Sequence, residues 1–424
     1  MATRSSSPAA GGAQNYLAPF IIVAGLFGIF GFLTSLNNQL VGKLKETFQL
    51  GSGQAALATT AWFLAYLIFS VPSAKLIERV GYKKTMVISL FMMVLGALAF
   101  VPAANSVSFP LTLGASFLLA TGVCALQTSA NPYAAILGPE HSAALRVNLA
   151  QAFNSAASAL APIVATTYIL ASSGAAESPA ERAHMLIGPY VVVAAALLVL
   201  AFAVMGLHLP AVTMTRDFRP SDVAITRSIW SYPHVVLGMA GIFFYVGVEI
   251  ALASFGVQFA REQHISGIQL FGHQFSDVQV AGSLVMVYYL LIMVGRFAGS
   301  ALMTKIKAEK LLVTLGIFGI VLMAVGMVTA GNAAVACLVL CGLANSIMYP
   351  TIFALGIAEL GPLTSKGSGV ITIGNVGGAV IPVLFGALAD RIGIQYAFII
   401  PIVCYIYVAY YGMWGHKPKR TQAA

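Results

Sequence analysis

The sequence predicts an all-α membrane protein whose twelve transmembrane helices form two six-helix bundles. Of its 424 residues, 59% are hydrophobic and 8% are charged, and the mean hydropathy is +0.89. This composition excludes a soluble globular protein. Apolar runs of about 20 residues, long enough to cross a bilayer, recur along the chain. They form two groups of six on either side of a polar stretch from His208 to Ser231.

The spans follow a small, polar N-terminal tail at 1–16, which has no apolar core or cleavage site and is expected to be disordered. The first bundle is predicted at 17–209, with spans at 17–41, 55–77, 85–104, 110–137, 147–171 and 187–209. A central linker at 210–231 precedes the second bundle at 232–414, with spans at 232–260, 280–303, 311–330, 333–358, 368–389 and 394–414. A short tail at 415–424 is expected in the cytoplasm.

Basic residues lie mainly in alternate loops. With the N-terminus inside, the inner segments hold sixteen Lys and Arg residues and the outer segments hold five. This excess predicts that both termini are cytoplasmic, and it explains the net charge of +9 without a nucleic-acid partner. Arg296 falls inside the eighth span. It is close enough to the inner end of that span to be predicted as an anchor at the membrane interface.

The two predicted bundles resemble each other in sequence. In the fourth span Asn131 precedes a proline and a tyrosine, and in the tenth span Asn345 precedes Tyr349 and Pro350. Such matches at equivalent positions indicate parallel six-helix repeats. Transporters built in this way place their ligand site between the repeats, near the middle of the membrane.

Uncharged amides gather within the spans of the first bundle. Gln127 and Asn131 are four residues apart, and Gln151 and Asn154 are three apart, so each pair lies on one helix face. Amides are costly to bury without partners, and their donors and acceptors match the hydroxyls of a sugar. Hydrogen bonds between helices are the alternative explanation for any one of them. The same polar lining is predicted to include Asn37, Asn38, Asn345 and Asn375, with Tyr349 and Trp62 facing the sugar ring.

One of the thirteen carboxylates, Glu249, lies in the middle of a span. A carboxyl group at that depth tends to hold a proton, because burial disfavours its charged form. Glu249 is therefore the candidate site for coupling transport to a cation. A structural hydrogen bond to a neighbouring helix, or direct contact with a sugar hydroxyl, are the alternatives.

The loop AKLIERVGYKK, from Ala74 to Lys84, resembles the signature of the major facilitator superfamily. Its residues Glu78, Arg79 and Lys83 are predicted to form a conformational gate, because an acidic group beside a basic turn can form a latch that differs between two conformations. Ordinary positive-inside anchoring is the alternative. A second copy, GALADRIG, falls in a predicted outer loop and is interpreted as the end of a helix.

Nothing in the sequence is typical of an enzyme. It contains no glycine-rich phosphate loop, no paired histidines at metal spacing and no nucleophile elbow. The four cysteines lie in apolar runs and are expected to be buried rather than to bind a metal or form disulfides. No cofactor or metal is expected beyond a co-transported proton or sodium ion.

The strings CALQTSANPY, RVNLAQAFNS and NSIMYPTIF are similar to the fucose permease branch of the major facilitator superfamily, and within it to bacterial glucose/galactose permeases. The resemblance implies alternating access and cation-coupled sugar uptake, with sugar contacts at Asn37, Gln127, Gln151 and Asn154. In the proton-coupled fucose permeases an aspartate and a glutamate stand where this chain has Asn38 and Gln127. Neither amide can titrate, so we expect coupling at Glu249 instead.

These observations predict a monomeric symporter of the bacterial inner membrane that imports a neutral hexose, glucose or galactose. N-acetylglucosamine and fucose remain alternative substrates. An uncoupled sugar facilitator and a membrane sensor that binds sugar without transporting it are alternatives from other functional classes.

Overall fold

The computed structural model describes residues 19–32, 35, 52–164, 181, 184, 187–206, 228–263, 269–270, 273–274 and 277–418. Within these residues the chain is almost entirely helical, which confirms the predicted fold class. A two-stranded antiparallel hairpin, β1 (Gln269–Leu270) and β2 (His273–Gln274), lies in the connection after the seventh predicted span. The sequence analysis did not predict this hairpin.

The first half comprises the helix Pro19–Phe32 and helices up to α7. Its elements are α2 (Ser52–Val80), α3 (Tyr82–Asn105), α4 (Phe109–Ile136), the 3-10 turn η1 (Glu140–Ser142), α5 (Ala143–Val164) and α7 (Ile187–Gly206).

The second half begins with a 3-10 turn, Ile229–Ser231, and ends with a short π-helix, Tyr411–Gly415. Between these lie α8 (Pro233–Glu262), α9 (Asp277–Leu302), α10 (Ala308–Val328), α11 (Gly331–Asn345), α12 (Met348–Gly356), η5 (Gly361–Leu363), α13 (Thr364–Ile373), η6 (Gly374–Val376), α14 (Gly377–Ile392), α15 (Ile394–Ala397) and α16 (Ile399–Tyr410).

Ten helical segments of the described chain are long and apolar enough to cross a membrane. In three of them consecutive helices form one span, as in α11 and α12 across Gly331–Gly356 and in α13 and α14 across Gly361–Ile392. The helix Pro19–Phe32 and α5 correspond to the first and fifth predicted spans. The four cysteines are free and buried, as expected.

Two spans of the second half are interrupted near their middle. The chain leaves the α-helix at Ser346–Ile347 and again at η6. The second interruption occurs where glycines pack tightly against α8: a Cβ atom at Gly377 would lie 1.9 Å from the carbonyl oxygen of Phe243. The first of these spans, α11 and α12, has α4 as its equivalent in the first half, and α4 is continuous through Asn131 and Pro132. The break at Ser346–Ile347 is therefore not repeated in α4.

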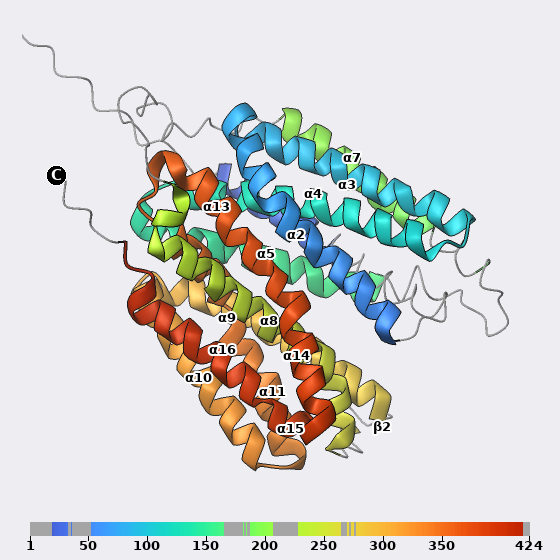
Figure 1. Cartoon of the computed structure of the whole chain (residues 1–424), viewed down its shortest axis with the longest axis vertical. Coiled ribbons are helices and arrows are strands. Elements are labelled where there is room, and N and C mark those ends of the chain that lie inside the picture. Colours follow the sequence, from blue (N-terminus) through green and yellow to red (C-terminus); the bar gives the residue numbers. More distant parts are fainter. Residues whose placement is uncertain are drawn as a thin grey trace, which may run out of the picture.

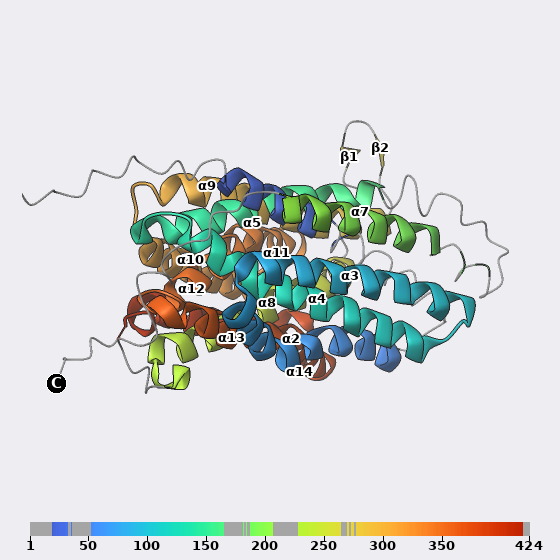
Figure 2. The same ribbon diagram turned by 90° about the horizontal axis from the view of Figure 1, so that it is seen from above.

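The two halves lie side by side and converge at the end where α13 begins, whereas they diverge toward the opposite end (Figure 1). Helix α5 packs against α9 and α12, and α2 packs against α13. The perpendicular view shows the helices of both halves running in roughly the same direction (Figure 2). We call the surface along which the halves meet the seam, and the end where they converge the closed end.

Candidate functional site

The amides of the first half meet between α4 and α5. The side-chain amide of Gln151 donates a hydrogen bond of 3.1 Å to Asn131 Oδ1, and both residues are buried. Asn131 Nδ2 and Gln127 Oε1 are also buried, and neither has a hydrogen-bond partner among the described residues. One more donor and one more acceptor are thus available in the predicted sugar-binding group.

Asn154 lies on α5, like Gln151, and joins α5 to the helix Pro19–Phe32. Its Nδ2 donates a 3.1 Å hydrogen bond to the carbonyl of Phe27, and the backbone of Asn154 packs so closely on Gly31 that a Cβ there would lie 2.4 Å from its carbonyl oxygen. The side chain is half-buried. Asn37 and Asn38, also predicted to bind sugar, lie outside the described residues.

The second half contributes Tyr349 and Asn375. Asn375 Nδ2 donates to the carbonyl of Thr372 at 2.8 Å and to the Tyr349 hydroxyl at 3.5 Å. The Tyr349 ring stacks on Phe353, and the Thr372 hydroxyl has no partner among the described residues.

The elements that carry Tyr349 and Asn375 also contact the first half. Helix α12 packs against α4, and η6 packs against α2. Cys124 of α4 lies 3.4 Å from the hydroxyl of Ser70 on α2. The structure therefore brings the predicted residues of α12 and η6 to the seam, opposite the first half.

Asn345 has a different environment. It is 0% exposed, accepts a 2.8 Å hydrogen bond from the Tyr405 hydroxyl and donates one of 2.6 Å to the Tyr288 hydroxyl. Both ends of the amide are occupied, and they join α11 to α16 and α9 inside the second half. The contacts match the alternative explanation, hydrogen bonding between helices, and leave no free atom for a sugar in this conformation.

Glu249 is half-buried on α8 among aromatic hydroxyls. It interacts electrostatically with Tyr245 on its own helix, with Tyr288 and Tyr289 on α9, and with Tyr349 on α12. Its carboxylate forms no ion pair within the described part of the chain. Glu249 lies one helical turn after Tyr245, whose ring centroid is 6.2 Å from that of Tyr349 in the predicted sugar site.

The prediction that Arg296 anchors at the membrane interface is wrong. Arg296 is 7% exposed, and its guanidinium donates to Ser346 O at 3.0 Å, to Gln151 O at 3.1 Å and to Ser155 Oγ. Two of these acceptors belong to α5, so the arginine bridges the seam. Its position near the end of α9 suggested snorkelling. The sequence alone could not show that its acceptors lie on a helix about 140 residues earlier.

Asn148 was missed by the sequence analysis. It is fully buried on α5, and its Nδ2 donates to the carbonyl of Arg296 at 2.9 Å and to Ser300 Oγ at 2.8 Å. The signal that could have revealed this contact is the small residue Gly299 next to Ser300. A Cβ at Gly299 would lie 3.5 Å from Asn148 Nδ2 and 2.3 Å from Ile347 of its own half, so the small residue leaves room for the approach of α5.

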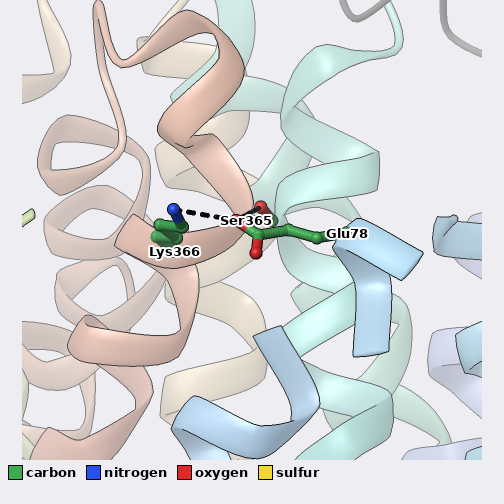
Figure 3. A network of polar contacts seen from close by, with 3 residues as sticks. All are labelled: Glu78, Ser365 and Lys366. Atoms are coloured by element: carbon green, nitrogen blue, oxygen red, sulfur yellow. Dashed lines mark hydrogen bonds and ion pairs between the residues drawn. The ribbon is translucent and has the colours of Figure 1, made fainter. Parts of the chain in front are cut away.

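The predicted gate residue Glu78 makes contacts across the seam at the closed end. Its carboxylate lies 3.6 Å from Lys366 Nζ and accepts a 3.4 Å hydrogen bond from Ser365 Oγ, so α2 is joined to α13 (Figure 3). Lys83 instead donates to the carbonyl of Met205, 2.8 Å away on α7 of its own half. Arg79 is exposed in the last turn of α2.

A second polar contact closes the same end. Glu140 Oε1, in η1 of the first half, accepts a 3.0 Å hydrogen bond from the backbone N–H of Glu359, which follows α12. Ser368 of α13 adds a 2.7 Å bond to the carbonyl of Thr128. Among the described residues, every hydrogen bond and ion pair between the halves lies between the middle of the helices and this end. The structure is therefore closed at the end that carries Glu78 and Glu140.

A cavity of about 690 Å³ also opens at the closed end, away from the amides. It is lined by the turn between α4 and α5 from the first half, and by the ends of α9 and α12 and the start of α10 from the second. It is therefore separate from the candidate sugar site, although it also lies between the two halves.

Comparison with known proteins identifies the family. The sequence pattern of the Major Facilitator Superfamily matches residues 16–380. The chain belongs to this superfamily. It is 40% identical over 408 residues to a glucose/galactose transporter of Brucella abortus, covering 95% of both chains. It is 29% identical over 414 residues to the L-fucose-proton symporter of Escherichia coli, covering 93% of this chain and 92% of that protein.

The structure of this superfamily member is similar to solved structures of the same fold. The Escherichia coli fucose:proton symporter matches with a TM-score of 0.81 at 28% identity, covering 95% of this chain and 99% of that chain. The structure of this symporter in the outward conformation gives a TM-score of 0.83. The family and fold predictions are confirmed: the chain is a multi-pass membrane transporter of the Major Facilitator Superfamily, not an enzyme.

Proposed function

We propose that this transporter imports a neutral hexose, glucose or galactose, together with a proton or sodium ion. The observation that carries the proposal is the uncharged polar group at the centre of the first half, where Gln151 holds Asn131 while Gln127 Oε1 and Asn131 Nδ2 stay unpartnered. A ligand rich in hydroxyls supplies both partners without introducing charge. The names of the relatives, glucose/galactose transporter and L-fucose-proton symporter, support the same substrate class.

Sugar recognition in this proposal involves both halves. Gln127, Asn131, Gln151 and Asn154 bind hydroxyls from the first half, together with Asn37 and Asn38. Tyr349 offers an apolar ring face from the second half, held in place by Asn375. Asn345 supports this side indirectly, because it fixes the helices that carry Tyr288 and Tyr405.

Glu249 carries the cation. It lies one helical turn after Tyr245, whose ring centroid is 6.2 Å from that of Tyr349, so a cation on its carboxylate and a sugar against the Tyr349 ring would be close enough to influence each other. A proton needs this one carboxyl group, whereas sodium would also recruit hydroxyl or carbonyl oxygens from the neighbouring tyrosines and backbone.

Transport proceeds by alternating access, in which bundles 17–209 and 232–414 rock against each other around the linker 210–231. The contacts of Glu78 and Glu140 then form the closed gate on one side. With the tails at 1–16 and 415–424 in the cytoplasm of a bacterial cell, this side faces inward. We propose that one chain in the bacterial inner membrane is the working unit.

Purified protein in proteoliposomes tests the function. We expect radiolabelled glucose and galactose to exchange in counterflow, and to accumulate above equilibrium under an inward proton or sodium gradient. Fucose and N-acetylglucosamine, added as competitors, reveal the preferred sugar. If no sugar accumulates under either gradient, the symporter proposal is wrong, and counterflow without accumulation would identify an uncoupled facilitator.

The variant Glu249→Gln tests the coupling residue. Glutamine keeps the size of the side chain, but it cannot take up a proton and has no negative charge to bind sodium. We therefore expect the accumulation ratio to fall to about one while counterflow persists. Glu262→Gln, at the end of the same helix, is the matched control and should accumulate sugar normally. Accumulation by Glu249→Gln at the wild-type level would contradict the assignment.

A further inference from the structure

Asn148 on α5 and Thr351 on α12 each have a deeply buried polar atom without a partner. Both residues are 0% exposed, and neither Asn148 Oδ1 nor Thr351 Oγ1 has a hydrogen-bond partner among the described residues. Helices α5 and α12 pack against each other across the seam. An unpartnered buried polar atom is costly, so these two atoms indicate a ligand that binds between the halves at another stage of the transport cycle.

Asn148 lies between the central amides and the cavity of the closed end. On α5 it stands three residues before Gln151 and four after Ala144, so the three residues share one helix face. Ala144 lines the cavity. On α4, Asn131 stands four residues before Ala135, which lines the cavity as well. Each helix therefore has one face that runs from a predicted sugar contact to the cavity.

The face of α12 that carries Thr351 leads into the same cavity. Ala354, Leu355 and Ala358 follow Thr351 by three, four and seven residues, and all three line the cavity. We call these faces of α4, α5 and α12 the release track. The track is closed in this structure, because Asn148 and Thr351 are fully buried where it passes from the amides to the cavity.

The other side of the seam, between α2 and α13, is packed more tightly. A Cβ at Gly369 would lie 2.6 Å from Ala74 Cβ and 2.9 Å from Ser70 O, so even a methyl group does not fit there. The ion pair of Glu78 with Lys366 closes the same side. By contrast, the cavity on the side of α5 and α12 has a volume of about 690 Å³, which is typical of a small-molecule site.

We propose that Asn148 Oδ1 and Thr351 Oγ1 form a second, transient binding position for the sugar, which the hexose occupies as it moves from the central amides through the cavity toward the cytoplasm. This inference rests on the proposed function, in which the protein imports a hexose and the closed end faces inward. Separation of α5 from α12 makes both atoms accessible, and the cavity already provides the space beyond them.

The chemistry of this position matches a neutral sugar. Asn148 Nδ2 is held by the carbonyl of Arg296 and by Ser300 Oγ, which leaves the amide oxygen free to accept from a sugar hydroxyl. The Thr351 hydroxyl can donate or accept. Ala144, Ala354 and other apolar residues of the cavity wall can contact the C–H groups of the ring. Two polar contacts bind a sugar only weakly, as a site on a release path requires.

Thr351→Val tests the proposal, because it removes the hydroxyl and keeps the shape of the side chain. Hexose flux down its own gradient is measured in de-energised, right-side-out membrane vesicles, in both directions. We expect the half-saturating internal sugar concentration for efflux to rise about threefold or more, and the external one for uptake to stay within about twofold of wild type. The control is Thr112→Val at the outer end of α4, a buried threonine whose hydroxyl is bound to Ser108 O, and it should change neither value.

Ala144→Leu tests the path through the cavity. The larger side chain narrows the cavity, so we expect the maximal rate of uptake to fall about fivefold while the half-saturating external concentration stays near that of wild type. Ala301→Leu is the matched control, because Ala301 is exposed near the end of α9 and does not line the cavity. A wild-type maximal rate in Ala144→Leu would show that the sugar does not pass through the cavity, which would overturn the proposal.

The outcomes for Thr351→Val are equally distinct. A water molecule that binds these atoms for structure alone would leave both half-saturating concentrations unchanged. An equal shift on both sides would place Thr351 in the central site, and a shift confined to uptake would place it on the entry path; each of these three results would overturn the proposal. If Ala144→Leu does not fold, as judged by gel filtration in detergent, Thr351→Val decides alone. Failure of the proposed function gives a different result, because wild-type vesicles would then show no hexose flux in either direction.

Discussion

At the scale of single residues, the centre of the transporter contains two kinds of amide. Asn345 has both of its polar atoms bound by tyrosine hydroxyls of its own half. Gln127 has a buried oxygen without a partner among the described residues. A satisfied amide stabilises the fold, whereas an unsatisfied one costs about 1–3 kcal/mol until something binds it. The difference separates positions that serve the fold from positions that we assign to the sugar.

The variant Gln127→Leu should therefore affect stability and binding in opposite directions. Removing the unpartnered oxygen should raise the free energy of unfolding by about 1 kcal/mol, while the half-saturating sugar concentration in counterflow rises about tenfold. The measurements are the thermal unfolding midpoint in detergent and counterflow kinetics. Asn345→Leu is the matched control and should lower stability, since it strands the hydroxyls of Tyr288 and Tyr405. A less stable Gln127→Leu protein with normal sugar affinity would refute the assignment.

The sequence predicted which amides share a helix face, because the spacing of Gln127 with Asn131 and of Gln151 with Asn154 follows from helix geometry. It could not predict their partners. Arg296 finds its acceptors on α5 of the other half. Asn148, which binds the same stretch of α9, falls in an apolar run like many helix-packing residues. Contacts between distant segments depend on how the halves meet, and no local pattern encodes that.

At the scale of elements, the interrupted spans of the second half place Tyr349 and Asn375. Tyr349 is the second residue of α12, directly after the break that follows α11, and Asn375 lies within η6. The close approach of α14 to α8 at Gly377 holds this region together. Glycine is needed there because any side chain would collide with the carbonyl of Phe243.

Replacing Gly377 with alanine should separate α14 from α8 and destabilise the second half. We expect a loss of about 1–3 kcal/mol in the free energy of unfolding, as for other overpacked positions, together with weaker sugar binding. Thermal unfolding and counterflow measure the two effects. The control is Gly114→Ala in α4, where a Cβ would meet nothing within 4 Å and should stabilise the helix slightly. Equal behaviour of both variants would contradict this role for Gly377.

The existence of the spans was predictable from hydropathy, since a bilayer imposes a minimum length on each apolar helix. The interruptions were not. The segment GNVGG has a low helix propensity but lies within the predicted eleventh span. In the structure its first three residues form the 3-10 turn η6, where Gly374 and Gly377 pack against the backbone of α8. The end of the helix at GALADRIG was predictable, because a glycine readily adopts the positive φ that ends a helix. Gly393 has φ +87 and follows the last residue of α14.

At the scale of the whole molecule, weak contacts hold the seam closed at one end. The Glu78–Lys366 ion pair is partly exposed, so it contributes below about 1 kcal/mol. The bond between Glu140 and the backbone of Glu359 is of the same order. A gate that must open in every transport cycle requires contacts of this strength, because a strongly bonded gate would trap the molecule in one conformation.

Reversing one charge should favour opening of the closed end, and reversing both should restore closure. We expect Glu78→Lys to shift the open population by up to about fivefold, and Glu78→Lys combined with Lys366→Glu to return it toward wild type. Spin labels on cysteines introduced at Lys84 and Lys310 report the distance by pulsed electron paramagnetic resonance. The four native cysteines are buried, which favours labelling of the introduced pair. An unchanged distance distribution in Glu78→Lys would show that this pair does not control the gate.

The cavity of about 690 Å³ at the closed end has a pharmacological consequence. Its walls come from both halves, so it takes this shape only while the halves are together. A compound that fills it gains contacts in the closed conformer that it loses in the open one, and so arrests the cycle by the difference in affinity. Such an inhibitor would act without resembling a sugar, and raising the external hexose concentration would not overcome it.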